Sequence, residues 1–136
     1  MPLKYAARLE QRLRKPCPCL VRFKPRAMRA YRFMHNQATE DDFVPPAIID
    51  EDFAPIVPCK RFALSFFKDV DSAREYFRTK LATREDAAAR YGDCIGEIDL
   101  LISDGLLSEP DLKGHMDLHQ EDGVIFAQRV RGYHAL

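Results

Sequence analysis

The 136-residue chain lacks any long apolar segment. No apolar run approaches the roughly 18–20 residues that a membrane-spanning helix needs, so we expect no membrane span and no membrane partner. The N-terminal stretch MPLKYAARLEQRLRK also lacks the apolar core of a secretory signal, because a charged residue recurs every few positions. The sequence therefore predicts a cytoplasmic protein.

The signatures of several common sites are absent as well. The six glycines are scattered at turns, which leaves no glycine-rich loop to hold a phosphate. Ser65 has no flanking glycines to form the sharp turn of a nucleophile elbow. Cys17 and Cys19 are separated by a single residue, which is less than the spacing of structural zinc sites. We therefore expect no metal site at these cysteines.

Acidic residues are almost missing from the first 37 positions, which hold ten Lys/Arg and only Glu10 as an acid. The remaining positions hold 11 Lys/Arg and 20 Asp/Glu, so a basic N-terminal arm precedes an acidic body. Such an arm can bind nucleic acid or an acidic partner, or it can lie along its own acidic body. The residues expected to make an intermolecular contact are Arg8, Arg12, Arg22, Lys24, Arg26 and Arg29.

The spacing of apolar residues predicts one α+β domain over residues 1–136. An amphipathic helix is expected over residues 3–14, within the basic arm of residues 1–37. Strands are expected at residues 20–23, 30–34, 61–67 and 94–102. A central helical pair is expected between residues 69 and 91, and the spacing of Val70, Ala73, Phe77 and Leu81 predicts the buried face of its first helix. Residues 35–58 are rich in proline and are expected to form a long, mostly irregular connection, in which Thr39 caps a short turn through residues 40–42. We therefore expect a small mixed or mostly antiparallel sheet with helices on one face.

Residues 113–132 are typical of a C-terminal β-hairpin closed by Glu121-Asp122-Gly123, with Gly123 in the left-handed conformation. In that register alternate side chains share a face. The expected core face carries Met116, Leu118, Val124, Phe126 and Val130. The other face carries His115, Asp117 and His119 opposite Ile125, Ala127, Arg129 and Arg131.

This polar face is the best candidate for chemistry in the sequence. Asp117 can orient a neighbouring histidine for proton transfer, and Arg129 can bind an anion. A metal site is the second possibility, but alternate strand positions lie about 6.6 Å apart, so His115 and His119, at twice that separation, cannot share one ion. The third possibility is a solvated face with cross-strand Asp–Arg and His–Arg neighbours.

Other residues resemble the layout of the small ADP-ribosyltransferases over about half of the chain. The matching features are an arginine on an early strand (Tyr31-Arg32), a serine strand leading into a helix (Leu64-Ser65-Phe66) and a polar pair on a late strand. The resemblance implies that Arg32 and Ser65 hold NAD and that a late carboxylate orients its ribose. This chain departs from the family at the late position, which offers His115-x-Asp117, or alternatively Glu97, in place of Glu-x-Glu or Gln-x-Glu. Phe67 also replaces the usual second hydroxyl residue.

Two functions are consistent with these patterns. The first is a small accessory protein that binds a macromolecular partner, either a protein or, through the basic arm, a nucleic acid, and needs no cofactor. The second is a nucleotide- or phosphate-handling enzyme with an ADP-ribosyltransferase-like layout and NAD as its ligand. Its catalytic residues would be Arg32, Ser65, His115, Asp117 and Arg129. Burial discriminates between the two, because a catalytic His115–Asp117 pair should lie in a cleft and have perturbed pKa values.

Overall fold

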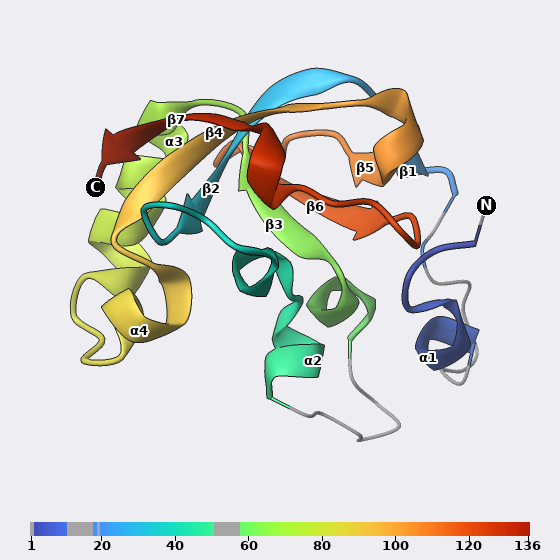
Figure 1. Ribbon diagram of the computed structural model, residues 1–136, viewed down its shortest axis with the longest axis horizontal. Coiled ribbons are helices and arrows are strands. Elements are labelled where there is room, and N and C mark those ends of the chain that lie inside the picture. Colours follow the sequence, from blue (N-terminus) through green and yellow to red (C-terminus); the bar gives the residue numbers. More distant parts are fainter. Residues whose placement is uncertain (1, 11–17, 19, 51–57) are drawn as a thin grey trace.

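The computed structural model describes residues 2–10, 18, 20–50 and 58–136. Seven strands of the described chain form one sheet in which every neighbouring pair is antiparallel (Figure 1). In sheet order they are β1 (Phe23–Lys24), β5 (Gly105–Ser108), β6 (His115–Gln120), β3 (Leu64–Phe67), β2 (Met28–Met34), β4 (Cys94–Leu100) and β7 (Val130–Ala135). The expected α+β class is confirmed, and the sheet is antiparallel rather than mixed.

One main helix covers a face of this sheet. It comprises α3 (Val70–Tyr76) and the π-helical turn η3 (Phe77–Leu81) that continues it. The helix begins at Asp69, whose side chain accepts a hydrogen bond from the Ser72 amide at 2.6 Å. Its buried residue Ala73 packs against Phe67 and Ile95 of the sheet. The helix expected from the spacing of Val70, Ala73, Phe77 and Leu81 is therefore confirmed.

The other helical segments are short. They are α1 (Ala6–Glu10), α2 (Pro46–Ile49) and α4 (Ala87–Tyr91), together with the 3-10 turns η1 (Glu40–Phe43), η2 (Cys59–Phe62), η4 (Ile102–Asp104) and η5 (Ala127–Arg129). The α1 helix packs its buried Leu9 against Ala47 of α2 and Phe62 of η2. Residues 11–14 of the expected N-terminal helix lie outside the described residues. None of the helices in the described ranges is long and apolar enough to span a membrane.

The main core lies on the opposite face of the sheet from α3. It contains Leu64 and Phe66 of β3 and Met116 and Leu118 of β6. Phe43 of η1 and Phe126 close it from outside the sheet, with their rings stacked at a centroid distance of 5.2 Å. Phe126 and Leu118 were both expected on a core face, and both are buried.

The C-terminal hairpin predicted for residues 113–132 is wrong. The turn itself exists, with Gly123 at φ +85°, but β6 pairs with β3 and β5, and β7 pairs with β4 at the far side of the sheet. The chain leaves β6 because the amides of Phe126 and Ala127 donate to the two carboxylate oxygens of Glu40 on η1, at 3.1 and 2.7 Å. These two hydrogen bonds hold Phe126 in the core against Phe43, away from the edge of β6. The second neighbour of β6, beside β3, is β5, a strand that was not expected from the sequence.

One other segment is more regular than expected. Thr39 caps η1 as predicted, but η1 and α2 give residues 40–49 helical structure in the segment 35–58, which was expected to be mostly irregular. Residues 51–57 of that segment lie outside the described residues. The basic segment 1–37 contributes β2, an interior strand between β3 and β4. Its second half is therefore part of the sheet.

Candidate functional site

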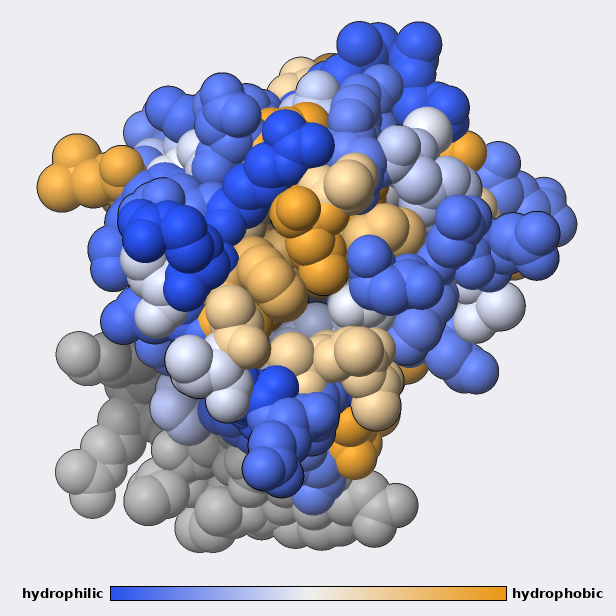
Figure 2. Space-filling view, turned by 90° about the vertical axis from the view of Figure 1, so that its left-hand side faces the viewer, coloured by the Kyte–Doolittle hydropathy of each residue, from blue (hydrophilic) through white to orange (hydrophobic). Residues whose placement is uncertain are grey.

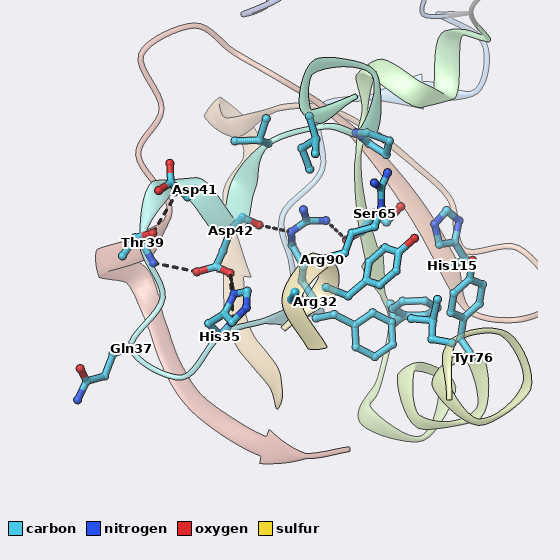
Figure 3. A pocket seen from close by; sticks show the side chains of 18 residues that line it. Arg32, His35, Gln37, Thr39, Asp41, Asp42, Ser65, Tyr76, Arg90 and His115 are labelled. Atoms are coloured by element: carbon cyan, nitrogen blue, oxygen red, sulfur yellow. Dashed lines mark hydrogen bonds and ion pairs between the residues drawn. The ribbon is translucent and has the colours of Figure 1, made fainter. Parts of the chain in front are cut away.

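A cavity of about 500 Å³ lies beside the end of β2. It is lined by residues that are distant in the sequence, from β2, η1, α2, β3, α3, η3, α4 and β6. Figure 3 shows Arg32 near its centre, with Ser65, Tyr76 and His115 to one side and His35 and Asp42 to the other. Residues of α3, η3 and α4 line part of the cavity. These elements lie on the side of the molecule that Figure 2 shows, where a band of apolar side chains is exposed on a largely hydrophilic surface.

The cavity forms where β2 and β3 separate. The two strands share a single residue pair, Tyr31 with Phe67, although β2 makes seven pairs with β4 and β3 makes four with β6. Beyond Tyr31 the guanidinium of Arg32 bridges the gap. Its Nη1 donates to the carbonyl of Ser65 at 2.9 Å, and its Nε donates to the carbonyl of Asp42 at 2.9 Å.

Arg32 occupies a core-facing position of its strand. Because side chains alternate along a strand, it shares a face with Ala30 and Met34, both fully buried. The guanidinium lies 5.8 Å from the ring centroids of both Phe43 and Phe66. Burial lowers the pKa of Arg32 to about 10, against the opposing charge of Asp42, so the group stays positive at neutral pH. Within the described ranges it forms no ion pair with a carboxylate, which is the electrostatic setting of an anion site.

Ser65, His115 and Asp117 approach the cavity from adjacent strands. Ser65 lies opposite Asp117 across β3 and β6, and Phe67 lies opposite His115. The His115 ring packs edge-on against Phe67 at 5.4 Å and parallel to Tyr76 at 6.4 Å. Ser65 and His115 line the cavity, and Asp117 lies behind His115 with its Oδ1 3.8 Å from the ring Nε2.

Asp117 has the perturbed carboxyl group expected of a functional site. Its side chain is only 16% exposed, and its carboxylate accepts no hydrogen bond from the part of the chain described. Burial raises the pKa of Asp117, and the positive charges of His115, Lys60 and Arg22 oppose this effect. A carboxyl group of raised pKa beside an imidazole can take part in proton transfer.

His35 and Asp42 form an ion pair at the cavity wall that the sequence analysis missed. The His35 Nδ1 lies 2.7 Å from Asp42 Oδ1, and its Nε2 lies 3.0 Å from the Ala88 carbonyl on α4. The pKa of His35 is raised, mainly by its hydrogen bond to Asp42. Burial raises the pKa of Asp42, but hydrogen bonds from His35 and the Thr39 amide outweigh burial and leave that pKa below its usual value. The Thr39–Asp42 capping box was the one sequence signal in this region.

Arg90 is a third cavity residue that was not predicted from the sequence. It extends from α4 and donates two hydrogen bonds of 2.8 Å to the carboxylate of Asp50, the residue that ends α2. Arg61 donates to the same carboxylate at 2.8 Å. These hydrogen bonds, that of Arg90 first, lower the pKa of Asp50 to about 2. The ion pair ties α2 to α4, and Arg90 is therefore already neutralised.

Arg129 and Glu97 do not join the cavity. Arg129 was expected beside Asp117, but it forms a two-bond ion pair with Asp104, at 2.7 Å for each bond, and also donates to the carbonyl of Asp99. Since β6 does not pair with the segment that carries Arg129, the expected Asp117–Arg129 contact is wrong. Glu97, the other residue considered for the late carboxylate, lies on β4 and contacts His134 and Arg131, both at 3.1 Å.

The six basic residues proposed for partner binding have different environments. Arg26 and Arg29 contact the chain's own acids, Glu109 at 3.4 Å and Asp99 at 3.0 Å. Arg8 lies over the ring of Phe62 at 5.2 Å. Arg22 and Lys24 are exposed, next to Leu20 and Val21, which are 67% and 82% exposed. Arg12 lies outside the described residues, as do Cys17 and Cys19.

In the described part of the chain, no three His, Cys, Asp or Glu side chains lie close enough together to hold a metal ion. Comparison of the chain with family models, with curated proteins and with solved structures finds no match.

Proposed function

We propose that this protein is a nucleotide-binding enzyme that accepts NAD in the cavity beside β2 and transfers its ADP-ribosyl group. One observation carries the proposal: Arg32, Ser65 and His115, from three successive strands of the sheet, line the same cavity. The resemblance to the ADP-ribosyltransferase layout implies that Arg32 and Ser65 hold the same NAD molecule, so these two residues must line one cavity. The third position departs from that layout, since an imidazole backed by Asp117 lies where the family has a glutamate.

The side chains of the cavity suit a dinucleotide. The guanidinium of Arg32, which forms no ion pair with a carboxylate of the described residues, provides the charge for a phosphate group. Phe33, Phe67 and Tyr76 provide aromatic surface for a base or for the nicotinamide ring. The volume of about 500 Å³ lies within the range of small-molecule sites.

The proposed reaction is a substitution at the ribose C1′ atom. The bond between C1′ and the nicotinamide nitrogen breaks, and nicotinamide leaves with the electron pair. An acceptor nucleophile, water in the simplest case, forms the new bond to C1′ and loses a proton. We assign the removal of this proton to His115, with Asp117 stabilising the imidazolium that forms.

Calorimetric titration with NAD, combined with chromatographic detection of released nicotinamide, tests this function. We expect the wild type to bind NAD and Arg32→Gln to bind it at least about tenfold more weakly, because a buried charged partner is lost. Arg78→Gln is the matched control, since Arg78 is 70% exposed on η3 and does not line the cavity. A wild-type protein that neither binds NAD nor releases nicotinamide from it would refute the proposal.

A second function, the binding of a macromolecular partner, is favoured by one surface observation. Leu20 and Val21 are large, exposed apolar residues directly before the exposed cations Arg22 and Lys24. We propose this segment as the contact for an acidic partner or a nucleic acid. Binding of a generic oligonucleotide should then fall steeply with salt and be weakened by Arg22→Gln with Lys24→Gln. An absence of binding at low salt would exclude nucleic acid as the partner.

A further inference from the structure

The ring of His35 faces a hydrogen-bond acceptor at each of its two nitrogens. Nδ1 faces the Asp42 carboxylate at 2.7 Å, and Nε2 faces the Ala88 carbonyl at 3.0 Å. A neutral imidazole carries one N–H and can satisfy only one of these acceptors. Both hydrogen bonds can therefore form only when His35 is an imidazolium. In this state the ring joins the end of β2 to η1 and α4, which are three walls of the cavity.

Asp42 connects this ring to Arg32. Its Oδ1 also accepts from the His35 amide at 3.0 Å, and its Oδ2 accepts from the Thr39 amide at 3.0 Å, so the side chain is held at both oxygens. The backbone carbonyl of Asp42 accepts from Nε of Arg32 at 2.9 Å. The position and orientation of the Arg32 guanidinium thus depend on Asp42, whose side chain is bound by the His35 ring.

Arg32 has one nitrogen left for a ligand. Nε and Nη1 are bound to the carbonyls of Asp42 and Ser65, whereas Nη2 has no partner among the described residues and Arg32 lines the cavity. The direction of that free N–H is set by the two carbonyls. A shift of the Asp42 carbonyl would turn it away from a bound phosphate.

We propose that His35, as an imidazolium, is a positioning residue for Arg32, and that a phosphate-bearing ligand therefore binds the cavity more weakly as the pH is raised. This proposal rests on the proposed function for the identity of the ligand, but the coupling between His35 and Arg32 does not.

The charged groups around His35 determine the direction in which its pKa is shifted. Asp42 on η1 and Asp93, which precedes β4, both favour the charged ring and raise its pKa above 6.5, while burial opposes them. On α4, Arg90 is neutralised by Asp50. The carboxylate of Asp41 also lines the cavity. As the pH rises through the raised pKa, the proton leaves and a nitrogen lone pair faces an oxygen, so either the Asp42 or the Ala88 contact is lost.

The first test is an NMR titration of the full chain without ligand. The nitrogen-15 shifts of the His35 ring should report both nitrogens protonated at low pH, and the Arg32 Nε–H resonance should move with the same midpoint as the ring. Asp42→Asn should lower the midpoint of the ring, because it removes the ion pair. In His35→Asn, which keeps one donor but does not titrate, the Arg32 resonance should stay constant with pH. An Arg32 resonance that ignores the titration of His35 would overturn the proposal.

The second test is calorimetric binding of ADP-ribose, whose phosphates keep their charge from pH 6 to pH 9. Wild-type affinity should fall by about tenfold over this range, which corresponds to one charge-assisted hydrogen bond. The profile should be flat for His35→Asn and unchanged from wild type for His134→Asn, a histidine that contacts Glu97 outside the cavity. A flat wild-type profile would overturn the proposal. A complete absence of ADP-ribose binding would count against the proposed function, and the ligand-free titration would still decide the coupling.

Discussion

Arg32 on β2 donates a hydrogen bond of 2.9 Å to the backbone carbonyl of Ser65 on β3, at the place where the two strands separate. This contact puts a permanent positive charge at a core-facing position, between the rings of Phe43 and Phe66. A charge at such a position generally stabilises a fold less than an apolar side chain of similar size does. The proposed binding of a phosphate group would give this charge a function.

Arg32→Met should separate folding from binding. Methionine fills similar space among Ala30, Met34 and the two phenylalanine rings and removes the buried charge, so we expect the free energy of unfolding to stay within about 1 kcal/mol of wild type. The same variant should lose measurable affinity for NAD. Urea denaturation and calorimetry measure the two quantities. A variant that unfolds several kcal/mol more easily would show that Arg32 is required for the fold.

Phe126→Ala should be strongly destabilising. Phe126 is fully buried and stacks on Phe43, so we expect a loss of about 3–5 kcal/mol in the free energy of unfolding, measured by urea denaturation. Ile125→Ala is the matched control. Its side chain is 58% exposed, and its removal should change stability by less than about 0.5 kcal/mol. Equal effects of the two variants would be incompatible with the described path of the chain after Gly123.

Asp117→Asn should stabilise the protein and abolish its activity. The pKa of Asp117 is raised in the fold, so its ionised form destabilises the native state above the carboxyl's unfolded value, and a neutral amide avoids this penalty. We expect a higher urea midpoint at pH 7, a difference that disappears as the pH falls below about 4. Nicotinamide release should drop by about 100-fold or more, as for the loss of a proton-transfer group.

Asp122→Asn, at an exposed turn, is the control for this variant and should change neither quantity. A less stable Asp117→Asn protein with wild-type activity would make Asp117 a purely structural residue.

Asp50→Asn should weaken the connection between α2 and α4. The carboxylate of Asp50 pairs with Arg90 and Arg61, and its pKa is lowered to about 2. A lowered pKa means that the stabilisation is present above the unfolded value of about 4 and is lost as the pH falls toward 2. We expect thermal unfolding to show a cost of about 1 kcal/mol at pH 7 that vanishes over this acidic range.

Glu109→Gln removes an exposed partner of Arg26 and should have little effect at any pH. A deficit in Asp50→Asn that is as large at pH 2 as at pH 7 would show that its amide disrupts packing, independently of the lost charge.

The spacing of side chains in the sequence was sufficient to predict several local features. The periodicity of Val70, Ala73, Phe77 and Leu81 predicted the main helix, and the alternation in His115–Gln120 predicted Met116 and Leu118 on a core face. Arg32 and Ser65 were also found, because they occupy recognisable places on an early strand and on the strand before a helix. The cavity residues His35, Asp42 and Arg90 were not predicted from the sequence. They line the cavity only because η1 and α4 pack beside β2.

By itself, the sequence determined the main helix and which side chains of β6 share a face, because these properties depend on spacing over a few residues. Only the tertiary structure decided which strands are neighbours. The segment after Gly123 had the alternation of a hairpin strand, but the hydrogen bonds to Glu40 and the burial of Phe126 against Phe43 direct it across the core to β7. These contacts link residues more than 80 positions apart, and a local pattern carries no information about partners at that distance.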